Sequence, residues 1–382
     1  MIAAIRYLLV AAVFALAQSA MAAEFETKAP RAILIDAKSG TVYFEKAADE
    51  LFPPASMSKL LTMVLVFEGL KAGTLKLDQE FVISEDAWKR GGSSSGGSTM
   101  YALVNSRVKL EDLMKGVVVQ SANDAAIAIA EGMAGSEPAF AVKMSDRARE
   151  LGLKLSTFRN ATGLPDPGHR MNVRELAMVA RYIISKFPDQ YKLYGMPEFE
   201  WNKIKQRNRN PLLTDYPGAD GMKTGFTDES GYGLVGSAVR NGRRLIMVIG
   251  GLKTAKERKD EAQKLLDWGF GQFKTVSIMA RGDAVGTARV WGGVEGTVPL
   301  VTSGAVDIML SPPEMKTAEL RLEYNGPLIA PVQAGVKVGS VRVLINGEVI
   351  LETPVETGAN VAAEDSMWGR ALDSVMIMVF GG

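Results

Sequence analysis

The chain has 382 residues, of which 44 are basic and 43 acidic, so that the formal net charge is +1 and the basic surplus typical of nucleic-acid binding is missing. With one histidine and no cysteine, disulfides and zinc sites built from several histidines are excluded, and catalysis would have to use serine, lysine, tyrosine or carboxylates. The length suggests two domains.

The first residues have the pattern of a secretory signal peptide. Arg6 supplies a positive charge, residues 8–17 form an apolar run, and Ala20-Met21-Ala22 offers small residues for cleavage. A membrane anchor is the alternative, although the apolar run is short for a membrane span. We therefore expect residues 1–22 to direct export and to be removed.

Residues 23–274 are predicted to form an α/β domain. A β-hairpin is expected over residues 31–46, and strands over 232–239 and 245–250. Helical periodicity marks residues 58–70, 110–119, 124–133, 138–151 and 173–187, with a closing helix at 257–273. Because strands flank a helical middle, we expect them to share one sheet beside a helical subdomain.

The composition changes near Thr275, and residues 275–358 are predicted to form a small all-β domain. Asn346-Gly347 between two apolar runs is typical of a tight hairpin. Further short strands are expected at residues 287–291, 298–302, 306–310 and 320–324. No helical period is convincing in this region.

The last segment, residues 359–382, is predicted to be an amphipathic helix that lies on a membrane surface. Apolar residues recur at helical spacing from Met367 to Phe380, over a length too short to cross a bilayer. Its polar face lacks the usual basic residues. A terminal helix packed on its own β-domain is therefore the alternative.

Three short motifs follow one another along the chain. The first is Ser56-Met57-Ser58-Lys59, just after two prolines at the start of a long helix, where free backbone N–H groups stabilise negative charge. A neutral Lys59 on the same helical face could take the proton of Ser56 as that oxygen attacks a carbonyl. Burial and the charge of Lys223 would both lower the pKa of Lys59. Alone, the motif would more simply be a helix cap and a solvated lysine.

The second motif, Ser121-Ala122-Asn123, lies between two helical segments. Ser121 either caps the next helix or relays a proton to a leaving amine, and Asn123 would hold Lys59 or the substrate amide. The third is Lys223-Thr224-Gly225, with glycines on both sides, which would let an extended peptide pair with a strand edge. Its lysine could instead discourage edge-to-edge aggregation.

A competing pattern, residues 92–96, fits the G-x-S-x-G nucleophile elbow. That elbow needs a buried strand before it and a helix after it, whereas here polar Gly-Ser sequence surrounds it. We expect a mobile loop at the edge of the site. His169, which would have to complete a triad with it, is expected to be a solvated loop residue.

With Asn160-Ala161-Thr162-Gly163-Leu164 and Asn208-Arg209-Asn210, these motifs make the chain resemble the D-alanyl-D-alanine carboxypeptidases, low-molecular-mass penicillin-binding proteins with a C-terminal β-domain. The resemblance covers nearly everything after the signal peptide. It implies that Ser56 is acylated, that Lys59 is its base, and that Lys223 is their electrostatic partner. It assigns Ser121 and Asn123 to proton and substrate relay, Thr224 and Arg209 to the substrate carboxylate, and the N–H groups of Ser56 and Phe226 to the oxyanion hole, with Gly225 beside the substrate. Many relatives carry histidine where this chain has Phe226, which leaves pH or substrate tuning there open.

The resemblance implies removal of the terminal D-alanine from peptidoglycan stem peptides, acylation by β-lactams, no metal or organic cofactor, and no nucleic-acid partner. It also implies a periplasmic location with the terminal helix on the membrane. The alternatives are a β-lactamase, a D,D-endopeptidase and a non-catalytic wall-binding scaffold. A β-lactamase of class A needs a glutamate-positioned water, and no clear acidic loop of that kind occurs between Asn123 and Lys223.

Overall fold

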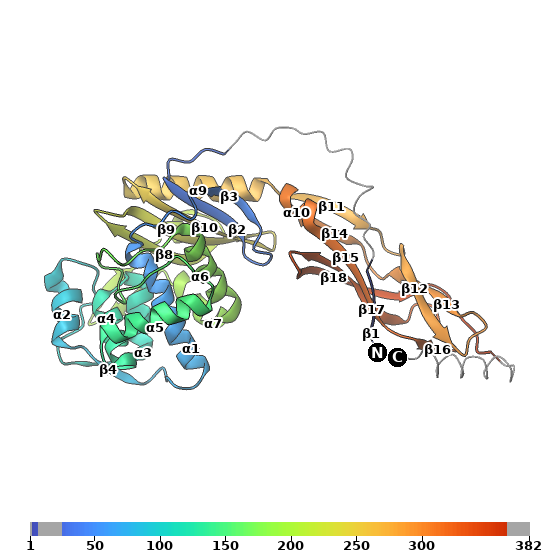
Figure 1. Ribbon diagram of the computed structural model, residues 1–382, viewed down its shortest axis with the longest axis horizontal. Helices are drawn as coiled ribbons and strands as arrows, with labels where there is room; N and C mark the ends of the chain where they lie inside the picture. The colour runs from blue at the N-terminus through green and yellow to red at the C-terminus, as the bar shows by residue number, and fades with distance from the viewer. Residues whose placement is uncertain (1, 7–24, 365–382) are drawn as a thin grey trace. The chain divides into compact units, whose positions relative to one another are not determined.

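The computed structural model describes residues 2–6 and 25–364 (Figure 1). They divide into a unit of residues Ala23–Gly271, which the sequence predicts to be the catalytic unit and which is called so below, and a second unit that continues from Gln272 and includes the N-terminal residues. The predicted boundary at residues 274 and 275 lies three residues further along. Most of the predicted signal peptide and residues 365–382 of the terminal helix predicted over 359–382 lie outside the described residues. Residues 359–364 are described and are not helical: Val361 forms a β-bridge with Val332 and Ala363 with Gly293, so a helix that begins at residue 359 is wrong.

The catalytic unit is built on a five-stranded antiparallel sheet in the order β3-β2-β10-β9-β8. The hairpin of β2 (Arg31–Asp36) and β3 (Val42–Lys46) joins β10 (Arg243–Leu252), which confirms that strands from both ends of this region share a sheet. Next come β9 (Gly231–Arg240) and then β8 (Ala219–Thr227). Strand β8 is therefore an edge strand, with one side free of other strands.

The alternation of side chains along these strands separates two layers. Ile33 and Ile246 belong to the core shared with the helical layer, whereas Leu34 and Leu245 face α9 (Ala255–Gly271). Gly269 of α9 lets this helix lie close, because a Cβ there would come within 2.3 Å of Leu34. Figure 1 shows α9 on one face of the sheet and the other long helices on the opposite face.

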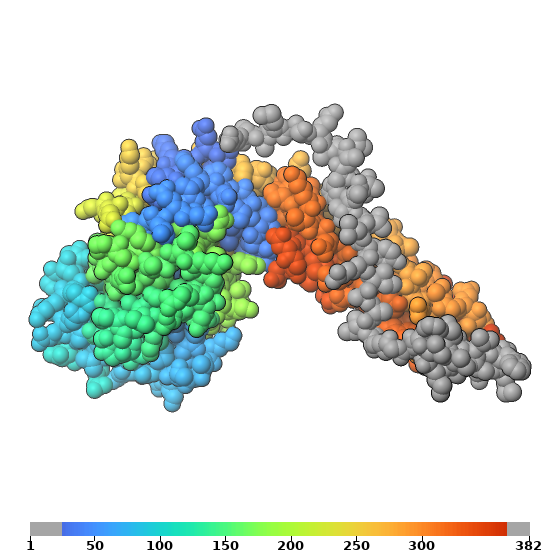
Figure 2. Space-filling model, in the orientation of Figure 1, coloured from blue at the N-terminus to red at the C-terminus, as the bar shows by residue number. Residues whose placement is uncertain are grey.

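The helical layer follows the predicted segments closely. Its longer helices are α1 (Lys59–Lys71), α4 (Asn123–Ala134), α5 (Glu137–Glu150) and α6 (Val173–Lys186). Shorter elements are α2 (Glu85–Gly91), α3 (Leu110–Lys115), α7 (Pro188–Tyr191), α8 (Leu212–Asp215), the 3-10 turns η1 (Ala55–Ser58), η2 (Ser93–Ser95) and η4 (Lys192–Gly195), and the pairs β4 (Glu80–Val82) with β5 (Arg107–Lys109) and β6 (Glu198–Trp201) with β7 (Ile204–Arg207). In Figure 2 the helices drawn in light blue to green form the lower part of this unit, below the dark blue N-terminal hairpin.

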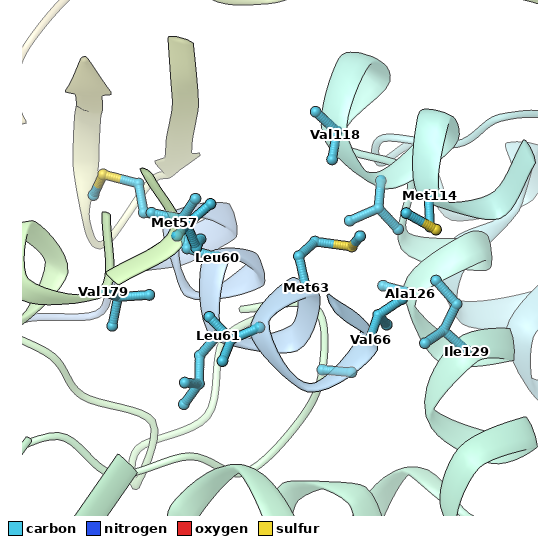
Figure 3. Packing of buried hydrophobic residues seen from close by; sticks show 14 of the residues in the cluster. Met57, Leu60, Leu61, Met63, Val66, Met114, Val118, Ala126, Ile129 and Val179 are labelled. Carbon is cyan, nitrogen blue, oxygen red and sulfur yellow. The ribbon is translucent and has the colours of Figure 1, made fainter. Parts of the chain in front are cut away.

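Helix α1 is the centre of the core. Its residues are apolar on nearly every side, as expected of a helix surrounded by protein, and Leu60, Leu61 and Val64 are fully buried. Figure 3 shows α1 between Ala126 and Ile129 of α4 on one side and α6 on the other. A helix packed this tightly holds its first residue, Lys59, and the preceding turn η1, which carries Ser56, in one position.

One predicted helix departs from the α-helical period. Residues 110–119 form α3 and then the π-helical segment η3 (Gly116–Gln120), where a residue is accommodated in a wider turn. The wider turn ends at Ser121, whose backbone has a left-handed φ of +66°. Periodicity predicts a helix here but does not reveal this local widening.

The second unit contains the β-rich region that the sequence predicts. Its main sheet has the order β1-β15-β17-β18-β13-β12-β16, and β11 pairs with β14. The strands are β1 (Ile2–Arg6), β11 (Lys274–Met279), β12 (Ala284–Trp291), β13 (Thr297–Thr302), β14 (Val306–Leu310), β15 (Ala318–Asn325), β16 (Leu328–Ile329), β17 (Lys337–Ile345) and β18 (Glu348–Thr357). Asn346 and Gly347 turn the predicted hairpin with φ of +52° and +80°.

A short helix in this unit was not predicted. Helix α10 (Pro312–Thr317) begins at Ser311, which forms a capping box with the buried Glu314. Its two prolines lie at the first helical positions, where proline is tolerated. Six residues are too few to produce a visible period, and only the cap signalled the helix.

Candidate active site

The segment that carries Ser56 is a tight turn between two prolines and a buried helix. Pro54 is the N-cap of η1, Ser56 lies in its first turn half-buried, and α1 follows at Lys59. Ala55 has a left-handed φ of +47°, a costly conformation for a residue with a side chain. Such strain persists only where tight surroundings hold it, and Ala55 is buried.

Lys59 is fully buried beneath Ser56 and touches three oxygens. Its Nζ lies 2.9 Å from Ser56 Oγ, and it donates to Asn123 Oδ1 at 2.7 Å and to the backbone oxygen of Thr162 at 2.6 Å. A neutral amine has two N–H groups and one lone pair. Because the two carbonyl oxygens can only accept, they take both N–H groups, and the lone pair is left for the hydroxyl of Ser56.

The pKa of Lys59 is lowered from 10.5 to about 7, mainly by burial and in second place by the positive charge of Arg209. The carboxylates of Glu137 and Asp124 act in the opposite direction. At neutral pH, a large share of the molecules therefore carries an uncharged amine next to Ser56. This is the protonation state that a general base requires.

The two polar residues of the second motif, Asn123 and Ser121, differ in their position at helix α4 and in their hydrogen bonds. Asn123 begins α4 and contacts Lys59, as the sequence suggested. Ser121 does not cap α4: Ala122 occupies the N-cap, so that this alternative is wrong. The Ser121 hydroxyl is buried and finds no hydrogen-bond partner among the residues of the described ranges.

The third motif lies on the edge strand β8, directly against the turn that carries Ser56. A Cβ at Gly225 would come within 2.9 Å of the Pro54 oxygen, so glycine is what allows this close approach. Lys223 is fully buried, and its Nζ donates to the Thr224 oxygen at 3.1 Å. Burial, followed by the charge of Lys59, lowers its pKa well below the usual value.

A cleft with a volume of about 520 Å³ gathers the three motifs. It is lined by Ser56, Gly96, Gly97, Ser98, Ser121, Asn123, Gly163, Leu164, Arg209, Thr224, Gly225, Phe226, Thr227, Tyr232 and Arg258. Of the residues predicted for the site, only Lys59 and Lys223 are absent from this lining, because they lie buried beneath it. The Gly-Ser segment does border the site, as expected.

The guanidinium of Arg209 borders the cleft and donates to Ser98 Oγ at 2.8 Å. The ring of Phe226 is 47% exposed and stacks on Tyr232 with their centroids 4.2 Å apart. Arg258 of α9 lies over the other ring at 5.4 Å. The cleft thus combines two cations with an aromatic wall.

Three groups that contribute to the site could not be assigned a role in it from the sequence motifs. The backbone oxygen of Thr162 accepts from Lys59, but any residue offers such an oxygen. Arg258 comes from a helix remote in sequence, and Glu137 is buried behind the cleft. In the sequence, only Gly163 could have indicated that its loop lies close to the turn that carries Ser56. Its φ is +76°, and a Cβ there would lie 1.9 Å from the Ala55 oxygen.

His169 was expected to be solvated, and that expectation is wrong. The ring is buried with 2% exposure and packs edge-on against Phe158. Burial lowers its pKa to about 4, so it is neutral at physiological pH. It does not line the cleft, and it is not part of a triad with the Gly-Ser segment.

A half-buried serine, a neutral lysine at its oxygen and an edge strand beside both can carry out acyl transfer to serine. Together with the sheet and the helical layer, they define the class of active-site-serine penicillin-recognising enzymes.

Comparisons with known proteins identify the family within this class. The D-alanyl-D-alanine carboxypeptidase family, peptidase S11, matches residues 17–254, and the C-terminal domain of penicillin-binding protein 5 matches residues 273–363. The chain therefore belongs to the D-alanyl-D-alanine carboxypeptidase family.

Individual relatives agree with this assignment. D-alanyl-D-alanine carboxypeptidase DacC of Escherichia coli K12 is 38% identical, over 95% of this chain and 93% of its own length. The crystal structure of penicillin binding protein 5 from Haemophilus influenzae is 34% identical with a TM-score of 0.67, over 89% of this chain and 99% of that one. Penicillin-binding protein D2 from Listeria monocytogenes, solved in its ampicillin-bound form, is 29% identical with a TM-score of 0.56, over 64% of this chain and 99% of that one.

Proposed function

We propose that Ser56 is the nucleophile of a D-Ala-D-Ala carboxypeptidase that removes the terminal D-alanine from peptidoglycan stem peptides. The observation that supports this best is the 2.9 Å contact between Ser56 Oγ and a buried lysine with a pKa of about 7. Family membership indicates the reaction, and this contact suggests which residues perform it.

In the first step, Ser56 Oγ attacks the carbonyl carbon of the penultimate D-alanine and its proton passes to Lys59 Nζ. The resulting oxyanion is bound by the backbone N–H groups of Ser56 and Phe226, the former in the first turn of η1, where N–H groups have no partner within the helix. The carbon–nitrogen bond then breaks. The departing amine takes a proton through Ser121, and an ester to Ser56 remains.

In the second step, water attacks the ester carbonyl and gives a proton to Lys59. The ester bond breaks, Ser56 Oγ regains a proton, and the shortened peptide leaves. Lys223 is the electrostatic partner of Lys59: the charge of Lys59 helps burial to lower the pKa of Lys223, so the two neighbouring amines disfavour being charged at the same time.

The substrate would lie extended along the free edge of β8, with Asn123 at its amide and Gly225 against its backbone. Its terminal carboxylate would meet Thr224 and Arg209, and Arg258 adds a second guanidinium in the same cleft. A guanidinium matches the planar geometry of a carboxylate, which makes this end of the cleft suitable for a free C-terminus.

β-Lactams would acylate the same serine, because the lactam imitates the D-Ala-D-Ala bond. The ampicillin-bound structure of the Listeria relative supports this interpretation. Family membership favours the carboxypeptidase over the β-lactamase and scaffold alternatives, whereas D,D-endopeptidase action is a further activity that cleavage of dimeric muropeptides would reveal.

The test is release of D-alanine from a D-Ala-D-Ala pentapeptide, followed by mass spectrometry of the product. Ser56→Ala should abolish both this release and labelling by a fluorescent penicillin. Ser58→Ala, two residues further along the same turn, is the matched control and should still be labelled. Labelling that persists in Ser56→Ala would refute the assignment of the nucleophile.

We further propose a periplasmic location, with export by residues 1–22 and peripheral membrane attachment by residues 365–382. Across the described part of the chain, none of the helices is long and apolar enough to cross a membrane. Deletion of residues 365–382 should move the protein from the membrane fraction to the soluble fraction, and an unchanged distribution would contradict the attachment.

A further inference from the structure

The loop that accepts the hydrogen bond of the base is held at three successive peptide units. While the Thr162 oxygen accepts from Lys59, the Ala161 oxygen accepts from Thr62 Oγ1 at 2.8 Å, and the Ala161 N–H donates to Glu137 Oε1 at 2.9 Å. Thr62 lies one turn after Lys59 on α1. The base and its acceptor are thereby joined in a ring of hydrogen bonds, and Glu137 holds this ring from outside.

Glu137 itself is almost fully buried, at the first position of α5. Its second oxygen, Oε2, accepts from Arg90 Nη2 at 2.6 Å, and Arg90 also pairs with Asp86. Burying a carboxylate is costly unless it is paired and hydrogen-bonded. Here one oxygen of Glu137 accepts from the Arg90 cation, and the other accepts from the backbone of residues 160–164, which we call the base-holding loop.

We propose that Glu137 is a positioning residue for the acylation step: by accepting from the Ala161 N–H it fixes the backbone of residues 160–162, so that the Thr162 oxygen takes one N–H of Lys59 and directs the lone pair of that amine at Ser56. This inference rests on the proposed role of Lys59 as the base. Glu137 does not border the cleft and touches no substrate. It acts through the loop, whose close approach to the nucleophile turn is set by Gly163.

A comparable ion pair elsewhere in the helical layer offers a contrast. Glu68 of α1 accepts from both Arg147 Nε and Nη2 and from Tyr182. It links α1 to α5 and α6, as a structural ion pair does, but its printed partners include no residue of the loop or the cleft. Loss of Glu68 should therefore cost stability without affecting the base.

The two members of the Glu137–Arg90 pair should move the pKa of Lys59 in opposite directions. The Glu137 carboxylate raises this pKa, and Arg90 neutralises part of that charge. The other charged or titratable groups that act on this region are Arg209, Asp124, Lys223 and His169 around Lys59, and Glu131 and Asp86 around the ion pair. All of them stay in place when only one member of the pair is changed.

The experiment measures the second-order rate constant for acylation by a penicillin against pH. In Glu137→Leu, the alkaline plateau should fall about tenfold or more, because a displaced loop no longer orients the amine, and the acid limb should move to lower pH. Glu137→Gln keeps an acceptor for the Ala161 N–H, so it should recover most of the plateau while the limb stays displaced. Arg90→Gln should move the limb to higher pH.

Glu68→Leu is the matched control: it should lower the melting temperature without changing plateau or limb. The proposal would be overturned if Glu137→Leu and Glu68→Leu gave the same pH profile of acylation. It would also be overturned if the acid limbs of Glu137→Gln and Arg90→Gln moved in the same direction. If Glu137→Leu does not fold, these two conservative variants still decide. Failure of the catalytic assignment is distinct, because Ser56→Ala would then remain labelled or the wild type would lack an acid limb.

Discussion

Replacing Lys59 by methionine should remove activity and also flatten the pH dependence of stability. Folding lowers the pKa of Lys59 from 10.5 to about 7. Between these two values the unfolded chain binds a proton that the folded chain does not, so the stability of the wild type rises with pH in this window. Lys59→Met has no such proton to lose.

The size of the effect follows from the shift. At 1.36 kcal/mol per pKa unit, the cost of burying Lys59 is about 4 kcal/mol at pH 7 and about 2 kcal/mol at pH 9. The stability of Lys59→Met relative to the wild type should therefore fall by about 2 kcal/mol between these two pH values. Asn123 Oδ1 and the Thr162 oxygen lose a donor in the variant, but they lose it equally at both pH values and so do not affect this difference.

Urea unfolding of both proteins at the two pH values measures this difference. The unit from Gln272 onwards is unchanged, so its transition is an internal reference. Lys71→Met, at the exposed end of the same helix, is the matched control and should show no such trend. A gap between Lys59→Met and the wild type that stays constant with pH would refute the idea that Lys59 is held neutral by burial.

Three further predictions concern the cleft. Acylation by penicillin should show an acid limb near pH 7, with the rate rising as Lys59 loses its proton, and Arg209→Gln should move that limb to higher pH, because the Arg209 charge lowers this pKa; an unmoved limb would contradict it. Gly163→Ala should reduce penicillin labelling at least tenfold, since its Cβ would meet the Ala55 oxygen at 1.9 Å, whereas Gly135→Ala, with open space around its Cβ, should label normally. Phe226→Ala should raise KM for a D-Ala-D-Ala peptide about fourfold, which is the effect of losing one methyl-sized apolar contact between the ring and the substrate. D-alanine release is the assay, and an unchanged KM would exclude the ring from substrate binding.

Much of the fold could be predicted because its elements follow simple periods. The apolar face of residues 173–187 corresponds to helix α6, and the alternation in residues 31–46 corresponds to the hairpin of β2 and β3. The π-helical turn before Ser121 and the short helix after Ser311 were missed, since a five- or six-residue element has no period to detect.

The sequence could predict those residues of the candidate site that act through a recognisable side chain. Ser56, Asn123 and Lys223 could be grouped because their motifs are recognisable in one order. The Thr162 oxygen and the buried Glu137 could not, because a backbone acceptor leaves no residue-specific trace and its support depends on packing. His169 shows the reverse error: loop-like neighbours suggested solvent, but tertiary contacts bury the ring.

Because the Lys59 amine is enclosed, activity depends on the structure around this amine staying closed. If the segment over the amine opens, water reaches the nitrogen and it becomes a cation with no lone pair to offer. Inactivation on heating should therefore come before loss of secondary structure, and it should reverse when the segment closes again.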